Sequence, residues 1–270
     1  MLKQRFLTAI VLAPLALFGV FGLPLEYFVY LLDMVMLLAA WEWANLSGFT
    51  EGKKRYSYVA TIAVIVAASH AFYTLLPVNE ILLISVLCWF VALYWVLKFP
   101  AGNGWRAEWQ RALIGVVVLM PCWFAFVQLK AGESGELLIL LLFLLVWGAD
   151  VGAYFSGKKF GCNKLAPNVS PGKTREGVYG GLLACVIVAL IFAIFEAASV
   201  GQAIVLLLLS IIVGCFSVLG DLFESMMKRY RGIKDSSQLL PGHGGILDRI
   251  DSLTSAAPLF VVGMQFIATI

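Results

Sequence analysis

Long apolar stretches separated by short polar segments make up most of this 270-residue chain. Nine of the stretches are long enough, or nearly so, to cross a hydrocarbon layer of about 30 Å as helices. The pattern therefore predicts an all-α polytopic integral membrane protein with about nine transmembrane helices. We place these helices at Phe6–Gly22, Leu25–Ala44, Tyr58–Leu76, Ile81–Leu97, Leu113–Leu129, Leu137–Phe155, Val178–Phe195, Ile204–Phe223 and Leu253–Ile270.

Composition and charge agree with a membrane protein and orient it. Apolar residues make up 61% of the chain and charged residues 13%, whereas soluble domains average about 45–50% and about 25%. With a cytoplasmic N-terminus, 18 of the 19 Lys and Arg residues fall on the inner side and only Lys130 falls outside, as expected because cytoplasmic loops retain basic residues. We therefore predict an external C-terminus and residence in the cell inner membrane. The basic inner face would attract anionic lipid headgroups and nucleotides.

No repeat and no Pro/Ser-rich linker divides the chain, so one integral domain over residues 1–270 is expected. Its N-terminal helices, residues 1–135, have short connecting loops and are interpreted as a scaffold. The two long inner loops, 156–177 and 224–252, belong to residues 136–270, where we expect the catalytic site. The first apolar stretch could instead be a secretory signal peptide. An uncleaved helix is favoured, because its removal would leave eight spans and nothing soluble to secrete.

Two candidate features belong to the sixth span and the loop after it. Asp150 lies about 20 Å along the helix from Leu137, and an ionised carboxylate within the membrane is costly unless it is paired or metal-bound. A structural Asp bonded to a neighbouring helix is the alternative. The loop ahead of the seventh span contains two prolines and a glycine, which forbid a continuous helix, and its side chains suit phosphate oxygens at a helix N-terminus. A basic stop-transfer loop explains the charges equally well. The candidates in this loop are Ser170, Lys173, Thr174 and Arg175.

The segment 220–252 holds most of the concentrated polar chemistry of the chain, between two apolar stretches. Near its start, Asp221, Ser225 and Lys228 recur at spacings of four and seven residues. If the eighth helix continues past Asp221, an acid, a hydroxyl and a base lie on one stripe that faces one ligand.

A glycine-rich turn around His243 comes next, where glycines permit close approach of the backbone to a substrate. Asp248 and Asp251 follow one turn apart at the start of the last helix. Carboxylates gathered at the inner ends of two helices would repel one another unless cations neutralise them, and oxygen ligands suit Mg²⁺ or Mn²⁺. A solvated loop of mixed charge is the alternative, and a lone histidine is more often structural than catalytic.

These residues resemble the C-terminal signature of the phosphatidate cytidylyltransferases, also called CDP-diacylglycerol synthases. The signature stands here as Ser225, Lys228-Arg229, Lys234-Asp235, Pro241 to Gly245 and Asp248-Arg249-Ile250-Asp251, about 27 residues without a gap. Looser features of the family are Asp150-x-x-Ala153-Tyr154, Ser170-Pro171-Gly172-Lys173-Thr174 and Gly220-Asp221-Leu222. By length and span count, the resemblance extends over the whole chain.

The resemblance implies that CTP and phosphatidate react to give CDP-diacylglycerol and pyrophosphate, with the active site facing the cytoplasm. It implies catalytic roles for Asp221, Asp248, Lys228, Lys234 and His243. Residues expected to bind the substrates are Ser170, Lys173, Thr174, Arg175, Ser225, Arg229, Gly244, Gly245 and Arg249. The expected partners are CTP, phosphatidate and the lipid bilayer, with no nucleic acid. Formation of a homodimer is left open.

Metal ions are expected because two anionic substrates must be brought together and the leaving pyrophosphate must be stabilised. A pair of Mg²⁺ or Mn²⁺ ions would serve both needs. Asp221 and Asp248 are the principal ligand candidates, and Asp251 and Asp150 are weaker ones. The resemblance also implies help from K⁺.

Three other classes of protein compete with this interpretation. A membrane transporter also carries intramembrane charges, but its sites tend to lie at the midplane between repeated halves. Here the acids gather at one face, and only Asp33 and His70 lie near the midplane, as two isolated groups. A CDP-alcohol phosphatidyltransferase would carry a DG-x-x-AR motif, which the sequence lacks. A non-catalytic scaffold would not require the spacing of Asp221, Asp248 and the His-Gly-Gly turn.

Overall fold

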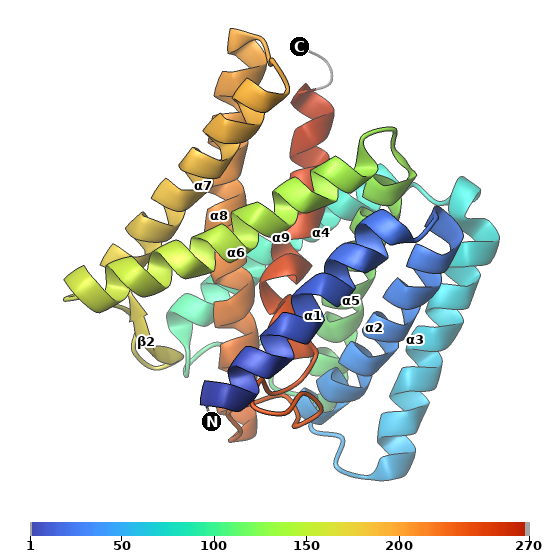
Figure 1. Cartoon of the computed structure of the whole chain (residues 1–270). Helices are drawn as coiled ribbons and strands as arrows, with labels where there is room; N and C mark the ends of the chain where they lie inside the picture. Colours follow the sequence, from blue (N-terminus) through green and yellow to red (C-terminus); the bar gives the residue numbers. More distant parts are fainter. Residues whose placement is uncertain (1, 268–270) are drawn as a thin grey trace.

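The structure is a computed structural model that describes residues 2–267, with side chains from residue 10 onward. Nine α-helices make up most of this range, and one small β-hairpin lies between the sixth and seventh helices (Figure 1). The helices are α1 Leu2–Gly22, α2 Leu25–Leu46, α3 Gly52–Phe72, α4 Val78–Lys98, α5 Glu108–Ala131, α6 Gly135–Phe160, α7 Arg175–Phe195, α8 Val200–Arg231 and α9 Leu247–Ile267. A short 3-10 turn, Tyr73–Leu75, extends α3, and the strands are β1 Lys164–Ala166 and β2 Ser170–Thr174.

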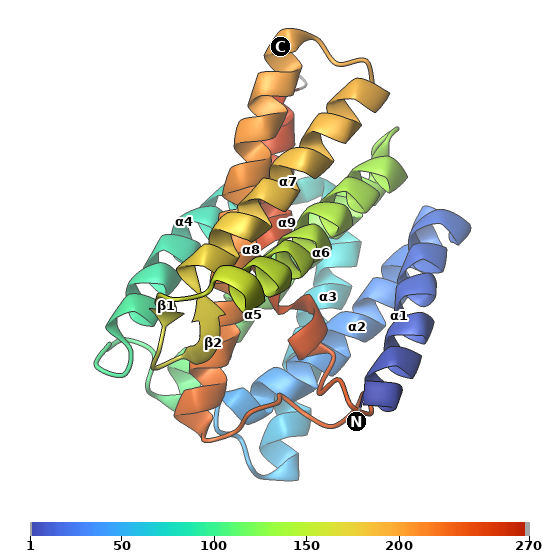
Figure 2. The same cartoon turned by 60° about the vertical axis from the view of Figure 1, so that its left-hand side comes forward.

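The observed helices confirm the polytopic all-α prediction. Eight of them are long and apolar enough to cross a membrane, and the apolar part of α1, Ile10–Gly22, is shorter within the described side chains. The described parts of the first and last helices have their free ends at opposite ends of the bundle (Figures 1 and 2). The chain is therefore a multi-pass membrane protein.

Several helices extend beyond the apolar stretches that predicted them. The eighth helix reaches Arg231, two turns past the predicted end at Phe223, and stops where Gly232 adopts φ +75°. A residue in this left-handed region ends a helix at little cost only if it lacks a Cβ. The last helix begins at Leu247 rather than Leu253, and its predicted end at Ile270 lies outside the described residues. Hydropathy thus located the apolar part of each helix and not the polar turns that continue it.

The loop predicted ahead of the seventh helix is ordered as an antiparallel hairpin. Lys164 pairs with Thr174 and Ala166 with Ser170. Thr174 then caps α7, because its Oγ1 accepts a hydrogen bond of 3.1 Å from the Gly177 backbone N–H. The hairpin therefore ends directly at the N-terminus of α7.

Glycines allow α6 and α7 to pack at very short range. A Cβ at Gly152 would lie 2.6 Å from the Gly180 carbonyl oxygen, and one at Gly181 would lie 2.7 Å from that of Ala149. Small residues at helix interfaces are the usual means of close packing in a membrane, where burial of apolar surface drives association weakly. This contact fixes Asp150 of α6 relative to the hairpin that precedes α7.

A second close contact joins α8 to α9 next to the predicted acids. A Cβ at Gly220 would lie 2.5 Å from both the Asp251 carbonyl oxygen and the Ser255 hydroxyl. The Ser255 hydroxyl donates a bond of 2.6 Å to the Phe216 carbonyl oxygen, which ties the two helices together. Phe223, only 1% exposed, packs between aromatic rings of α2 and α4 and holds the C-terminal part of α8 in the core.

Candidate active site

The C-terminal end of α8 presents a group of polar side chains, as its sequence spacing predicted. The Ser225 hydroxyl donates to Asp221 Oδ1 at 3.2 Å, one turn away. Lys228 turns instead toward two other acids, with its Nζ 2.6 Å from Glu224 Oε2 and 2.5 Å from Asp248 Oδ1. The continued helix is confirmed, but the three residues do not all face one point, because Lys228 is buried between α8 and α9.

Asp248 organises the glycine-rich turn from the first turn of α9. Its Oδ2 accepts hydrogen bonds from the Ser236 amide at 2.9 Å, the Ser236 hydroxyl at 2.8 Å and the Gly245 amide at 2.7 Å. A Cβ at Gly244, where φ is +81°, would lie 2.5 Å from the same oxygen. The glycines at 244 and 245 therefore allow the chain to wrap this carboxylate.

Lys173 of the hairpin and Asp150 of α6 lie at the same place. Lys173 of β2 forms an ion pair of 2.7 Å with Asp221 of α8. Asp150 of α6 lies close enough to Lys173, Asp221 and Arg249 to interact with them electrostatically. Asp251 of α9 interacts in the same way with Asp221, Lys173 and Lys228. The four predicted metal-binding acids, Asp150, Asp221, Asp248 and Asp251, therefore gather where α6, α8, α9 and the hairpin meet.

The other predicted site residues differ in their contacts and in their exposure to solvent. The Thr174 hydroxyl caps α7, and the Arg229 guanidinium donates to the carbonyl oxygens of Val169 and Ile233, which ties the hairpin to the 232–246 loop. Ser170 is half-buried in β2. The charged groups of Arg175, Lys234 and Arg249 are exposed at this end of the bundle. His243 and Gly244 are half-buried and Gly245 is buried in the turn.

One cavity joins the acids to the apolar interior of the bundle. It has a volume of about 460 Å³, and apolar side chains from α1, α2, α5 and α6 form most of its wall. Its polar end is formed by Asp150, His243, Asp248, Arg249 and Asp251. The cavity is therefore amphipathic, with carboxylates and a guanidinium at one end and alkyl and aromatic groups along the rest.

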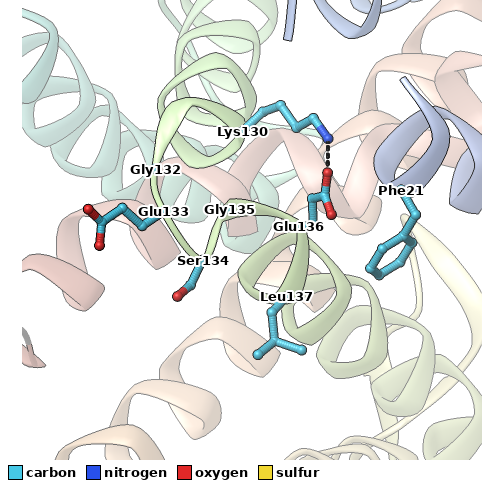
Figure 3. Close-up of a pocket in the computed structure, with 8 residues that line it drawn as sticks. All are labelled: Phe21, Lys130, Gly132, Glu133, Ser134, Gly135, Glu136 and Leu137. Atoms are coloured by element: carbon cyan, nitrogen blue, oxygen red, sulfur yellow. Dashed lines mark hydrogen bonds and ion pairs between the residues drawn. The ribbon is translucent and has the colours of Figure 1, made fainter. Parts of the chain in front are cut away.

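A second cavity, of about 370 Å³, lies at the α5–α6 connection, at the other end of the bundle from the 232–246 loop (Figures 1 and 2). Figure 3 shows Lys130 and Glu136 pointing toward one another, and their charged atoms lie 2.6 Å apart. Lys130, the single basic residue predicted outside, also donates to the Val20 carbonyl oxygen and is buried. This cavity contains none of the predicted site residues.

Comparison with known proteins decides the family. The model of the Cytidylyltransferase family matches residues 3–267. The chain belongs to the cytidylyltransferase family. It is 48% identical to a phosphatidate cytidylyltransferase of Pseudomonas aeruginosa, over 96% of both chains. It is 40% identical to one of Haemophilus influenzae, over 96% of this chain and 97% of that one, and 35% identical to one of Brucella suis, over 96% and 91%. These relatives are named as transferases, so the transporter alternative gains no support.

The residues of this cytidylyltransferase fit a divalent cation by their chemistry. Five carboxylates, counting Glu224, stand beside the basic groups of Lys173, Lys228 and Arg249, and Glu224 Oε1 is buried with no hydrogen-bond partner. An excess of oxygen ligands with negative charge suits Mg²⁺. Among the described residues, no three acids or histidines already stand in a metal-binding arrangement. Lysine ammonium groups bond to Asp221 and Asp248 instead.

Two acids at the site were missed in the sequence. Glu224 lies one turn before Lys228 on α8, and that spacing could have indicated it. Glu42 of α2, fully buried, reaches the glycine-rich turn from the half of the chain assigned to the scaffold. The sequence feature that could have indicated Glu42 is its position as a carboxylate inside an apolar stretch, between Trp41 and Trp43. The division into scaffold and catalytic halves itself stays a prediction.

The two midplane residues that looked isolated in the sequence are bonded to each other. His70 Nε2 lies 2.9 Å from Asp33 Oδ2, and the Trp123 indole N–H donates to Asp33 Oδ1 at 2.7 Å. Helices α2, α3 and α5 are thereby joined by one polar cluster. Within the part of the chain that the structure describes, its hydrogen bonds do not reach the acids at the end of α8.

Proposed function

We propose that this cytidylyltransferase transfers CMP from CTP to phosphatidate, giving CDP-diacylglycerol and pyrophosphate for phospholipid biosynthesis. Three relatives at 35–48% identity are named phosphatidate cytidylyltransferase, and each covers nearly the whole chain. The observation that carries the proposal is the amphipathic cavity. An apolar wall that ends in carboxylates and bases suits a substrate with acyl chains and a phosphate headgroup.

The reaction needs little acid or base catalysis from the protein. A phosphate monoester has a second pKa of about 6, so phosphatidate already presents a nucleophilic oxyanion at neutral pH. One of its oxygens forms a bond to the α-phosphorus of CTP while the bond from that phosphorus to the bridging oxygen breaks. The bridging oxygen leaves with the electron pair as part of pyrophosphate. The protein's task is to align two anions and to stabilise the charge that moves onto the leaving group.

We assign this task to the basic residues and acids at the inner end of the bundle. Lys173 of the hairpin and the exposed Arg175, Lys234 and Arg249 would bind phosphate oxygens and offset the repulsion between substrates. Asp221 and Asp248 would hold Mg²⁺ as principal ligands, with Asp251, Asp150 and the unpartnered oxygen of Glu224 as further donors. Mg²⁺ held there would stabilise negative charge on the transferred cytidylyl group and on the leaving pyrophosphate. Lys228 keeps the acids of α8 and α9 together.

Location, further cations and assembly complete the proposal. The charge distribution supports a site at the cytoplasmic face of the inner membrane, since 18 of 19 Lys and Arg residues then lie inside. A second Mg²⁺ or Mn²⁺ and a K⁺ remain predictions, which titration of each ion in the assay would check. A homodimer likewise remains a prediction, to be tested by light scattering of the detergent-solubilised protein.

The decisive experiment uses the full chain in membranes or detergent micelles. Incubation with labelled CTP, phosphatidate and Mg²⁺ should yield a lipid-linked CMP and an equal amount of pyrophosphate. Diacylglycerol, which keeps the acyl chains and lacks the phosphate, is the matched control and should give no product. Absence of lipid-linked CMP from a folded protein would end this proposal.

A further inference from the structure

Glu42 is a fully buried carboxylate that connects α2 to the turn before α9. Its Oε1 accepts hydrogen bonds from the Ser237 hydroxyl at 2.5 Å and the Ile246 amide at 3.0 Å. Its Oε2 accepts from the Leu247 amide at 2.6 Å and shares the single Ser236 hydroxyl proton, at 3.0 Å, with Asp248. Both oxygens are thus used to hold two separate pieces of the 232–246 loop and the first residue of α9.

The donors to Glu42 are neutral, which distinguishes it from the other acids at this end of the bundle. Asp221 and Asp248 bond to lysine ammonium groups, whereas the four bonds to Glu42 come from hydroxyl and amide groups. Hydrogen bonds to an ionised acceptor are about twice as strong as neutral ones. Two of the donors are amides at the N-terminus of α9, where a negative charge is also favoured by the helix dipole. The carboxylate is therefore suited to fix a backbone conformation.

The segment that Glu42 holds is the one that wraps Asp248. The Ser236 hydroxyl lies within hydrogen-bond distance of both carboxylates, 3.0 Å from Glu42 and 2.8 Å from Asp248. A Cβ at Gly245 would collide with the Glu42 carboxylate and the Ser236 hydroxyl. Glu42 and Asp248 therefore contact the same turn. A change at Glu42 is expected to shift the Ser236 and Gly245 groups that bond to Asp248.

We propose that Glu42 is a positioning residue for nucleotidyl transfer, which acts through the Ser236, Gly245 and Leu247 contacts to set the orientation of Asp248. This role rests on the proposed function. Glu42 lies behind the turn and acts on the reaction through Asp248 alone. Residues that orient a metal ligand typically change metal affinity or activity about 10–100-fold when they are replaced.

The test compares Glu42→Gln with Glu26→Gln, the same substitution at an exposed site on the same helix. Glutamine preserves the size of the side chain but directs an NH₂ group at hydroxyl and amide donors. We expect Glu42→Gln to raise the Mg²⁺ concentration that gives half-maximal activity and to lower kcat at saturating CTP. The resulting decrease in kcat/KM should be about 10–100-fold. Glu26→Gln should match the wild type in both measurements.

Hydrogen exchange gives a readout that needs no activity. The amides of Ile246 and Leu247 donate to Glu42, so a peptide covering residues 236–247 should exchange at least about tenfold faster in Glu42→Gln. Peptides from α5 should be unchanged. Ser237→Ala removes a single hydroxyl donor and should shift the exchange and the Mg²⁺ dependence in the same direction by a smaller factor. Ser237→Ala allows the same two measurements if Glu42→Gln does not fold.

The outcomes separate this role from the proposed function. An active wild type with unchanged Mg²⁺ dependence in folded Glu42→Gln would overturn the role of Glu42 alone. Faster exchange in the 236–247 peptide with unaltered kinetics would also overturn it, because Glu42 would then stabilise the loop without affecting the reaction. A wild type that forms no lipid-linked CMP would overturn the proposed function and this role with it.

Discussion

Replacing Asp248 with Asn probes both the charge and the loop contacts of one proposed metal ligand. Its carboxylate accepts four hydrogen bonds, from Lys228 Nζ at 2.5 Å and from two groups of Ser236 and one of Gly245 at 2.7–2.9 Å. Asparagine has one acceptor oxygen in place of two. If that oxygen keeps the three loop bonds, the new NH₂ group faces the Lys228 ammonium, which cannot accept a hydrogen bond.

The structure allows the cost to be compared with that of Asp221→Asn. Removing one partner of a buried ion pair costs about 3–5 kcal/mol of stability, and Lys228 keeps its bond to Glu224, so we expect about 3 kcal/mol for Asp248→Asn. The side chains of Asp221 and Lys173 are 29% and 26% exposed, and a partly exposed pair contributes about 1 kcal/mol or less. The apparent melting temperature should therefore fall by about 6–12 °C for Asp248→Asn and by about 2–4 °C for Asp221→Asn.

Activity should fall in both variants by more than stability explains. Each loses one negative oxygen ligand of the proposed Mg²⁺ site, and a loss of about 3–4 kcal/mol of transition-state stabilisation lowers turnover by about 10²–10³-fold. Lipid-linked CMP formation is measured across a Mg²⁺ series at a temperature where each variant is folded, beside thermal unfolding in detergent. Asp235→Asn, an exposed position in the same loop, is the control and should be milder. Near-normal turnover of the two ligand variants at low Mg²⁺, or equal melting temperatures, would refute this reasoning.

Two other predictions concern the basic residues and the topology. Lys228 is buried between two acids, so Lys228→Ala should cost about 3–5 kcal/mol of stability. Arg175 is exposed, so Arg175→Ala should keep the wild-type melting temperature and raise KM for CTP. Equal destabilisation of the two variants in thermal unfolding would contradict the placement of Lys228. In a variant with Cys162→Ser, a cysteine introduced at Lys164 should react with an impermeant reagent only from the cytoplasmic side, and one at Gly135 only from outside. Labelling of both from one side would remove the nine-helix topology.

Much of this protein could be predicted from local sequence alone. The number of long apolar segments predicts the number of helices. A backbone that crosses lipid must satisfy its hydrogen bonds within its own segment, so each such segment forms a helix. The basic residues predict an orientation in the membrane that stays a prediction. The spacing of Asp221 and Ser225 on one helix places them in contact without reference to the rest of the fold. The gathering of Asp248 and Asp251 at the start of the last helix also followed from spacing.

Contacts between distant segments were decided only by the tertiary structure. Hydropathy and helical spacing describe one segment at a time, so they could not show that Lys173 pairs with Asp221, or that Lys228 turns to Glu224 and Asp248. They also could not bring Glu42 to a turn about 200 residues later in the chain. A buried carboxylate needs hydrogen-bond or charge partners. The packing of helices through glycines and aromatic rings decides which distant residues become those partners.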